Sequence, residues 1–238
     1  MKHTKQQETK KDKEWISAYL LLFGLAIMVA GFSVITLYFN LALGIYNEIV
    51  VSTFWIFAVI PLIAYFFYLK SKGLMSFSEI GLRFEGTLKS ILLGSVAGAA
   101  LGLIGWFFLN LTGSPVEKLP DVYVHWFILS SVFSAPIREE ILVRGLLWSA
   151  VERAISHVIE VKKWKIGESK KGIMVVTIIS VSFMLMHWGR PLEIMFTTLL
   201  IDSFAYSLLY YKTKNLVAPI TAHAISNLFV VVRPLIFL

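Results

Sequence analysis

The sequence predicts an all-α membrane protein, a polytopic helical bundle of about seven (six to eight) transmembrane helices. Hydrophobic residues make up 57% of the 238 residues and the mean hydropathy is +0.74, which is typical of a membrane domain. Apolar runs long enough to cross a bilayer recur along the chain, with short polar connections between them. Lysine and arginine concentrate in alternate connections, as topology signals do.

Residues 1–14 are polar and charged, and we expect a solvated cytoplasmic tail there. The rest of the chain, 15–238, is expected to form a single transmembrane domain. The first apolar run is too long for the apolar region of a signal peptide, so it is expected to remain as a spanning helix. The predicted spans are residues 15–39, 49–69, 90–109, 122–150, 172–188, 191–211 and 216–238.

Residues 70–89 are polar and are expected to form a loop or an interfacial piece. The run that follows, 90–109, contains small residues, among them Gly94, Gly98 and Gly102. Small residues let helix backbones approach closely in membranes. This run is therefore predicted to pack tightly against another helix.

The fourth run, 122–150, would be roughly 45 Å long as one helix, which exceeds the thickness of a bilayer core. It must therefore tilt, break near Pro136, or emerge into water. The lysine-rich segment that follows it, 151–171, is expected to be exposed.

Seven spans place the two termini on opposite sides of the membrane. With the N-terminus inside, 17 lysines and arginines lie in cytoplasmic segments, and three, Lys118, Arg190 and Arg233, lie outside. Because cytoplasmic connections carry the excess of basic residues, we predict a multi-pass integral membrane protein with a cytoplasmic N-terminus, in the cell membrane if the cell is prokaryotic. The net charge of +7 does not indicate nucleic-acid binding, because the basic residues flank apolar runs.

Four charged residues lie inside the fourth run: Arg138, Glu139, Glu140 and Arg144. Ionised side chains are costly at membrane depth, so they need a partner or a function. Glu140 and Arg144 lie four residues apart with the acid first, which is the favourable order for a helical ion pair. Glu139 points about 100° away from Glu140, and the residue four positions after it is Val143, which carries no charge. Glu139 is predicted to be free of a cation partner and available for chemistry.

The later spans carry His187, His223, Asn227 and Asp202 in apolar surroundings. A carboxylate with a histidine can take a proton from water, while a second histidine and an amide can hold a developing oxyanion. The set of Glu139, His187 and His223 could instead bind a divalent metal of the zinc type. The absence of cysteine excludes thiolate metal sites and a cysteine nucleophile. Asp202 is left without an assigned role.

Three short motifs follow one another in separate apolar runs. EExxxR is matched by Glu139, Glu140 and Arg144, FxxxH by Phe183 and His187, and HxxxN by His223 and Asn227. With these motifs the sequence resembles the CPBP or Abi family of intramembrane proteases. That family includes the type II CAAX prenyl endopeptidases (Rce1-like) and bacteriocin-processing or self-immunity proteins. One such motif is weak, but three in family order are specific, and the resemblance covers residues 75–238.

The resemblance implies an intramembrane endopeptidase that hydrolyses a peptide bond near the cytoplasmic face. Glu139 would activate water with the help of His187, while His223 and Asn227 would bind the oxyanion. It implies either no cofactor or one divalent metal, and a peptide or lipidated peptide as substrate, including prenylated CAAX-type peptides. The candidate catalytic residues are Glu139, Glu140, His187, His223 and Asn227, with Arg144 and Phe183 in support.

Two other classes of function fit the same residues. The first is a non-proteolytic scaffold or bacteriocin self-immunity protein that uses the polar cluster for recognition or structure. The second is a proton-coupled transporter in which Glu139, Asp202 and the histidines form a relay. The transporter ranks last because the two halves of the chain show no matching pair of broken segments.

The depths of the candidate residues are predicted to differ. Counted at 1.5 Å per residue from the predicted cytoplasmic ends, His223 lies about 10 Å deep, Glu139 about 17–20 Å and His187 about 22 Å. A tilt, a helix that begins outside the lipid, or a break at Pro136 is needed for the three side chains to meet.

Overall fold

The computed structural model of the chain describes residues 16, 17, 20, 21, 24, 59–112, 128–187 and 192–236. Within these residues the regular structure is entirely helical, with no strand, as predicted. Three helices are long and apolar enough to cross a membrane: Thr87–Leu111, Glu168–Met186 and Leu192–Thr213. Most of the first predicted span and residues 49–58 of the second lie outside the described residues. The predicted total of seven spans is therefore not confirmed.

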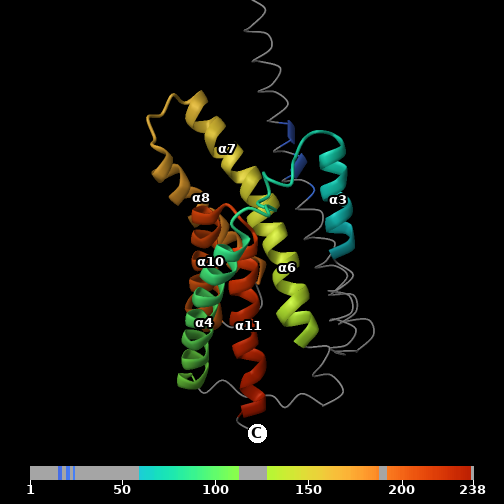
Figure 1. Ribbon diagram of the computed structural model, residues 1–238. Coiled ribbons are helices and arrows are strands. Elements are labelled where there is room, and N and C mark those ends of the chain that lie inside the picture. The colour runs from blue at the N-terminus through green and yellow to red at the C-terminus, as the bar shows by residue number, and fades with distance from the viewer. Residues whose placement is uncertain are drawn as a thin grey trace, which may run out of the picture.

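Several of the described helical segments follow one another directly (Figure 1). In chain order they are α3 (Val59–Ser71), α4 (Thr87–Leu111), the π-helical segment η1 (Leu129–Ser134), α6 (Ala135–Glu140), the π-helical segment η2 (Ile141–Leu147), α7 (Trp148–Val161), α8 (Glu168–Met186), α9 (Leu192–Ile194), the π-helical segment η3 (Met195–Leu199), α10 (Leu200–Thr213) and α11 (Val217–Ile236). The last four predicted runs and the third each correspond to helical segments.

One continuous helix contains η1, α6, η2 and α7 and ends at Val161. It does not break at Pro136. The prediction that residues 151–171 form an exposed segment is wrong for its first part, because 151–157 continue the helix and are partly buried, with α7 packed against α8. From Val158 to the end of the helix most residues are exposed. Pro136 lacks a backbone N–H, and η1 ends just before it. Pi-helical turns inside α-helices are frequent at functional sites, and here they flank the Glu139–Glu140 pair on both sides.

Close packing of α4 on α11 depends on the predicted small residues (Figure 1). A β-carbon added to Gly94 would lie 2.4 Å from the carbonyl oxygen of Ala218 on α11. One added to Gly98 would lie 2.5 Å from the carbonyl oxygen of Ala222. Both distances are shorter than real contacts, so the two backbones can approach this closely only where the β-carbon is missing.

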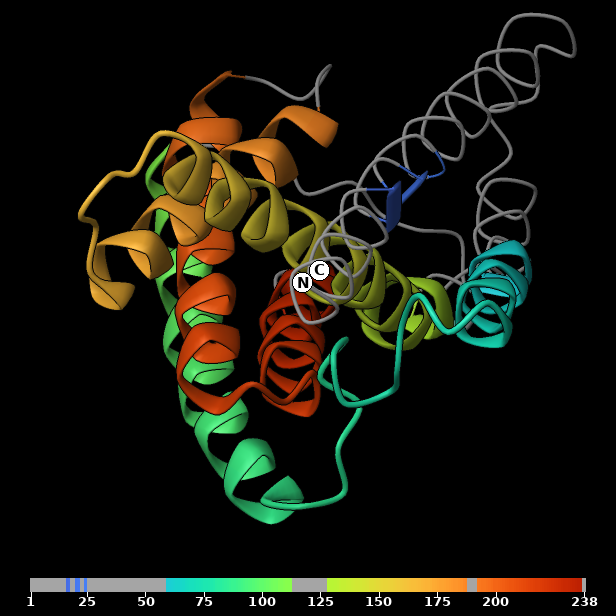
Figure 2. The same cartoon turned by 90° about the horizontal axis from the view of Figure 1, so that it is seen from above.

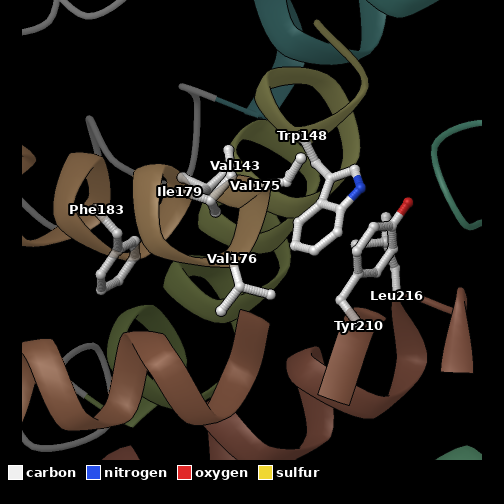
Figure 3. Close-up of a cluster of buried hydrophobic side chains, with 8 residues drawn as sticks. All are labelled: Val143, Trp148, Val175, Val176, Ile179, Phe183, Tyr210 and Leu216. Atoms are coloured by element: carbon white, nitrogen blue, oxygen red, sulfur yellow. The ribbon is translucent and has the colours of Figure 1, made fainter. Parts of the chain in front are cut away.

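A cluster of buried hydrophobic residues joins η2 and α7 to α8 and α10 (Figure 3). Trp148 and Tyr210 meet edge to face, with ring centroids 5.0 Å apart and planes at 72°, and Phe183 lies at the opposite side of the cluster in Figure 3. The cluster fixes α8 and α10 against the helix that carries the Glu139–Glu140 pair. Its members are Val143, Trp148, Val175, Val176, Ile179, Phe183, Tyr210 and Leu216.

The lysine-rich connections lie together at one end of the bundle. The backbone N–H of Leu216, in the α10–α11 turn, donates to the carbonyl oxygen of Gly81 in the 72–86 loop at 2.8 Å. Lys214 of the same turn forms an ion pair with Glu152 of α7 at 3.3 Å. Seen from above in Figure 2, α7 crosses from α6 to α8. The three basic connections that were predicted to share one side of the membrane are therefore neighbours.

The α4–α11 contact predicts that two glycine-to-alanine substitutions in α4 differ in their effect on stability. Gly98→Ala should destabilise the protein by about 1–3 kcal/mol, because its β-carbon would meet the α11 backbone. Gly105→Ala is the matched control, because no atom of the described residues lies within 4 Å of its added β-carbon; it should be neutral or stabilise the helix by up to about 1 kcal/mol. Thermal unfolding of both variants in detergent measures the difference, and equal effects would contradict this packing.

Candidate active site

Glu140 is completely buried at the end of α6. Its Oε1 accepts hydrogen bonds from the Arg144 guanidinium at 3.1 Å and from Nδ1 of His223 at 2.9 Å. The predicted ion pair between Glu140 and Arg144 is therefore present, and the same oxygen also holds a histidine of α11. A buried carboxylate needs such partners because an uncompensated charge is strongly destabilising in a protein interior.

Arg144 connects its own helix to α10 and α8. Its Nη2 donates to the Ser203 carbonyl oxygen at 2.8 Å, to Ser203 Oγ at 2.6 Å and to Ser207 Oγ at 3.3 Å. The guanidinium carbon lies 4.6 Å from the centre of the Phe183 ring, which is a cation–π contact. Ser203 and Ser207 were not among the predicted site residues. Their spacing of four residues in an apolar helix is the signal that could have indicated a shared polar partner.

Glu139 has a cation partner, which corrects the prediction that it has none. The Arg138 guanidinium donates to Glu139 Oε1 at 2.9 Å. Adjacent residues do not face each other on a regular helix, but the arginine side chain is long enough to fold back onto its neighbour. One carboxylate oxygen of Glu139 is therefore held by Arg138, and the other oxygen faces the histidines.

Two histidines approach the second oxygen of Glu139 from different segments. Glu139 Oε2 lies 3.9 Å from Nε2 of His187, just after α8, and 4.0 Å from Nε2 of His223 on α11. These separations are too long for direct hydrogen bonds, but an oxygen atom about 2.8 Å from each partner would bridge them. The side chains of Glu139, His187 and His223 are 17%, 25% and 8% exposed. The site is thus neither sealed nor on the open surface.

Contacts at Nδ1 orient both imidazole rings. His187 Nδ1 lies 2.9 Å from the Phe183 carbonyl oxygen, and His223 Nδ1 lies 2.9 Å from Glu140 Oε1. Because a carbonyl oxygen and an ionised carboxylate can only accept, both Nδ1 atoms carry a proton. In a neutral ring the Nε2 atom then has a lone pair, and both Nε2 atoms face Glu139.

Asn227 lies one turn beyond His223 on α11. Its side-chain amide donates to the carbonyl oxygen of Ser131 in η1 at 2.8 Å. An amide NH2 group has two hydrogens, so this bond uses one of them. The bond ties α11 to the π-helical segment that precedes the Glu139–Glu140 pair. Its role as an oxyanion donor stays a prediction.

Asp202 and Tyr206 lie on the face of α10 that meets α11. The Asp202 carboxyl group is partly buried and lies near Ser226 and His223 of α11. The Tyr206 ring stacks on the His223 ring, with centroids 5.0 Å apart and planes at 18°. Both residues therefore form part of the surroundings of His223.

The three metal-ligand candidates do not fit a zinc ion as they are placed. With zinc–ligand bonds of about 2.0–2.1 Å, neighbouring ligand atoms of a tetrahedral site lie roughly 3.3 Å apart. Glu139 Oε2 is 3.9 Å and 4.0 Å from the two Nε2 atoms. Among the described residues, no group of three or more His, Asp, Glu or Cys side chains has an arrangement that could hold a metal ion. The spacing fits a hydrogen-bonded water molecule better.

Comparison with protein families gives a match over the same helices. Residues 121–229 match the family model described as type II CAAX prenyl endopeptidase Rce1-like. We call residues 121–229 the Rce1-like region after this match. The predicted resemblance is confirmed there, and the Rce1-like region contains all three motifs. Searches of curated proteins and of solved structures found no match.

The Rce1-like region indicates the general kind of protein. It supports a CAAX-type intramembrane protease, that is, a hydrolase that acts on peptides at a membrane. Together with the three apolar helices long enough to cross a bilayer, it indicates an integral membrane protein.

The buried ion pair predicts a large effect of Arg144→Met. This change would leave Glu140 without its guanidinium in a fully buried position, so it should destabilise the protein by about 3–5 kcal/mol. Arg153→Met is the matched control. Arg153 pairs with Glu79 and donates to Ser17 Oγ and to the Leu74 carbonyl oxygen, but its ion pair is partly exposed, so water can replace the lost partner and the loss should be smaller. Thermal unfolding in detergent compares the two variants. A loss for Arg144→Met no larger than that for Arg153→Met would contradict the anchoring role.

Proposed function

We propose that this protein is an intramembrane endopeptidase in which Glu139 activates a water molecule to hydrolyse a peptide bond. The observation that carries the proposal is the approach of Glu139 Oε2 to the Nε2 atoms of His187 and His223, at 3.9 Å and 4.0 Å. The Rce1-like match supports the same kind of function. As substrates we propose prenylated CAAX-type peptides, the class named in the description of that family, because a lipid chain would bring the peptide to the membrane.

The site is proposed to open toward the cytoplasm. His223 lies six residues after Val217, the first residue of α11, which is about 9 Å of helix. The start of α11 is at the end of the bundle where the lysine-rich connections gather. Because basic connections favour the cytoplasmic side, this end is expected to face the cytoplasm.

In the proposed reaction, water donates one hydrogen bond to Glu139 Oε2 and another to Nε2 of neutral His187. A lone pair of the water oxygen then attacks the carbonyl carbon of the scissile bond, while a proton passes to Glu139. When the tetrahedral intermediate collapses, the C–N bond breaks and Glu139 transfers the proton to the leaving nitrogen. Glu139 thus acts first as a base and then as an acid.

His223 and Asn227 are proposed to stabilise the oxyanion of the intermediate. The Glu140 carboxylate lies 2.9 Å from His223 Nδ1 and so orients the ring, whose Nε2 can donate to the oxyanion when it carries a proton. The second amide hydrogen of Asn227 could add a further donor. In this scheme Glu140 acts through His223 and is a positioning residue.

The proposal predicts that Glu139→Gln abolishes cleavage of a farnesylated CAAX peptide by the purified protein, because an amide cannot accept the proton from water. His187→Ala should slow cleavage by about 10²–10⁴-fold. Product formation is measured by mass spectrometry, and folding by thermal unfolding. Glu168→Gln is the control, because Glu168 is an exposed residue of α8 outside the site, and its activity should match the parent protein. Normal cleavage by folded Glu139→Gln protein would overturn the mechanism.

The same assay with a strong chelator distinguishes a mechanism without metal from one that needs a divalent metal. If Glu139 and His187 activate the water without a metal, the rate should not change. Loss of activity that added zinc restores would instead assign Glu139, His187 and His223 as metal ligands.

Arg138 is proposed to position Glu139 by holding its Oε1, so that Oε2 faces the water. Arg138→Met should lower kcat by about 10–100-fold with little change in KM, because misplacement of a catalytic group slows the chemical step. Arg138→Lys keeps the positive charge and should restore part of the loss. An unchanged kcat per folded Arg138→Met molecule would show that Arg138 serves only stability.

A further inference from the structure

The α7–α8 hairpin, defined as residues 158–171, is the most basic described part of the chain. In Figure 1 this connection extends beyond the ends of α10 and α11. It contains five lysines and two glutamates, and one of these glutamates, Glu168, forms an ion pair with Lys171 at 2.7 Å. The remaining lysines form no ion pair with any residue that the structure describes, and all are exposed: Lys162, Lys163, Lys165 and Lys170.

Exposed apolar side chains lie among these lysines. Val158, Val161 and Trp164 are 41%, 60% and 52% exposed. The backbone that presents them is well defined, because Lys163 has a φ of 52° and the N–H of Trp164 donates to the Ile159 carbonyl oxygen at 2.9 Å. This arrangement caps the end of α7. The hairpin therefore presents a fixed surface in which apolar and basic side chains alternate.

The position of the hairpin relative to α8 identifies the partner. Glu168, the first residue of a helix that is long and apolar enough to cross a membrane, lies only four residues after Trp164. Ile173, one turn into that helix, is 59% exposed, as a lipid-facing residue would be. The hairpin is thus held at the depth where lipid headgroups lie. Tryptophan is enriched at this depth, and clustered lysines attract anionic lipids.

We propose that the α7–α8 hairpin binds the headgroups of anionic phospholipids. Trp164, Val161 and Val158 enter the headgroup region, while the four exposed lysines contact lipid phosphates. The proposal is independent of the peptidase reaction, because it rests on residues outside the candidate active site.

The absence of cysteine from the chain permits a direct test. Trp164→Cys in the full-length protein creates a single site for a nitrobenzoxadiazole label. The labelled protein is placed in vesicles of phosphatidylcholine alone or mixed with phosphatidylglycerol in both leaflets, so that its orientation does not matter. In vesicles with the anionic lipid, the emission of the label should shift to the blue, and quenchers attached to lipid headgroups should reach the label. One molar salt should reverse the shift, because it shortens the Debye length to about 3 Å.

Charge variants and a second label position are the controls. Replacing Lys162, Lys163, Lys165 and Lys170 by glutamine should remove the dependence on anionic lipid, whereas replacing them by arginine should keep it. In the Thr112→Cys variant the label lies just after α4, and its emission should be the same in both kinds of vesicle. Equal emission of the Trp164→Cys label in the two vesicles, or a shift that survives the glutamine changes, would overturn the proposal. The salt titration needs no lysine variant, so a folding defect in one variant does not prevent a decision.

Discussion

The buried ion pair between Glu140 and Arg144 is the constraint on which the rest of the site depends. A carboxylate and a guanidinium with no exposure need strong partners, because a buried uncompensated charge is strongly destabilising. Arg144 Nη2 donates to Ser203 and Ser207 of α10, and Glu140 Oε1 accepts from His223 of α11. Glu140 Oε2 and Arg144 Nε have no hydrogen-bond partner among the described residues. Three helices are therefore held in one arrangement by a single pair of charges. Such a pair is weak as a source of stability, but it strongly favours this arrangement over others in which a charge lacks its partner.

Charge balance gives Glu139 a position in which it can remain ionised. Glu139 and Glu140 are matched by Arg138 and Arg144, each within hydrogen-bonding distance of one carboxylate. Arg138 occupies only Oε1 of Glu139, and Oε2 faces two imidazole nitrogens whose rings are fixed through Nδ1. The negative charge of Glu139 is thus balanced by Arg138, while its Oε2 can still accept a hydrogen bond. A general base in an apolar environment needs this combination.

The π-helical segments determine which way these side chains point. Each residue added to a helical turn rotates everything that follows by about 100°, so η1 and η2 set the directions of the Glu139–Glu140 pair and of α7 relative to the earlier part of the helix. The bond from Asn227 to Ser131 holds η1 against α11. The start of α8 also lies beyond the ends of α10 and α11 (Figure 1). A residue count from the start of α8 therefore overstates the depth of His187, and side chains that were predicted to differ by two turns can meet.

Sequence patterns alone were sufficient for the helical class, the positions of the later helices, the close contact through Gly94 and Gly98, and the Glu140–Arg144 pair. Each of these follows from composition or from spacing within one helix, which backbone geometry converts directly into position. The contact of Arg138 with Glu139 was missed, because it depends on a long side chain folding back rather than on helical spacing. The serines of α10, the continuation of α7 to Val161 and the approach of His187 and His223 to one oxygen were decided only by the tertiary structure. These features depend on how separate helices pack and on where the helix takes wider turns, and neither is encoded in the spacing of residues along a single segment.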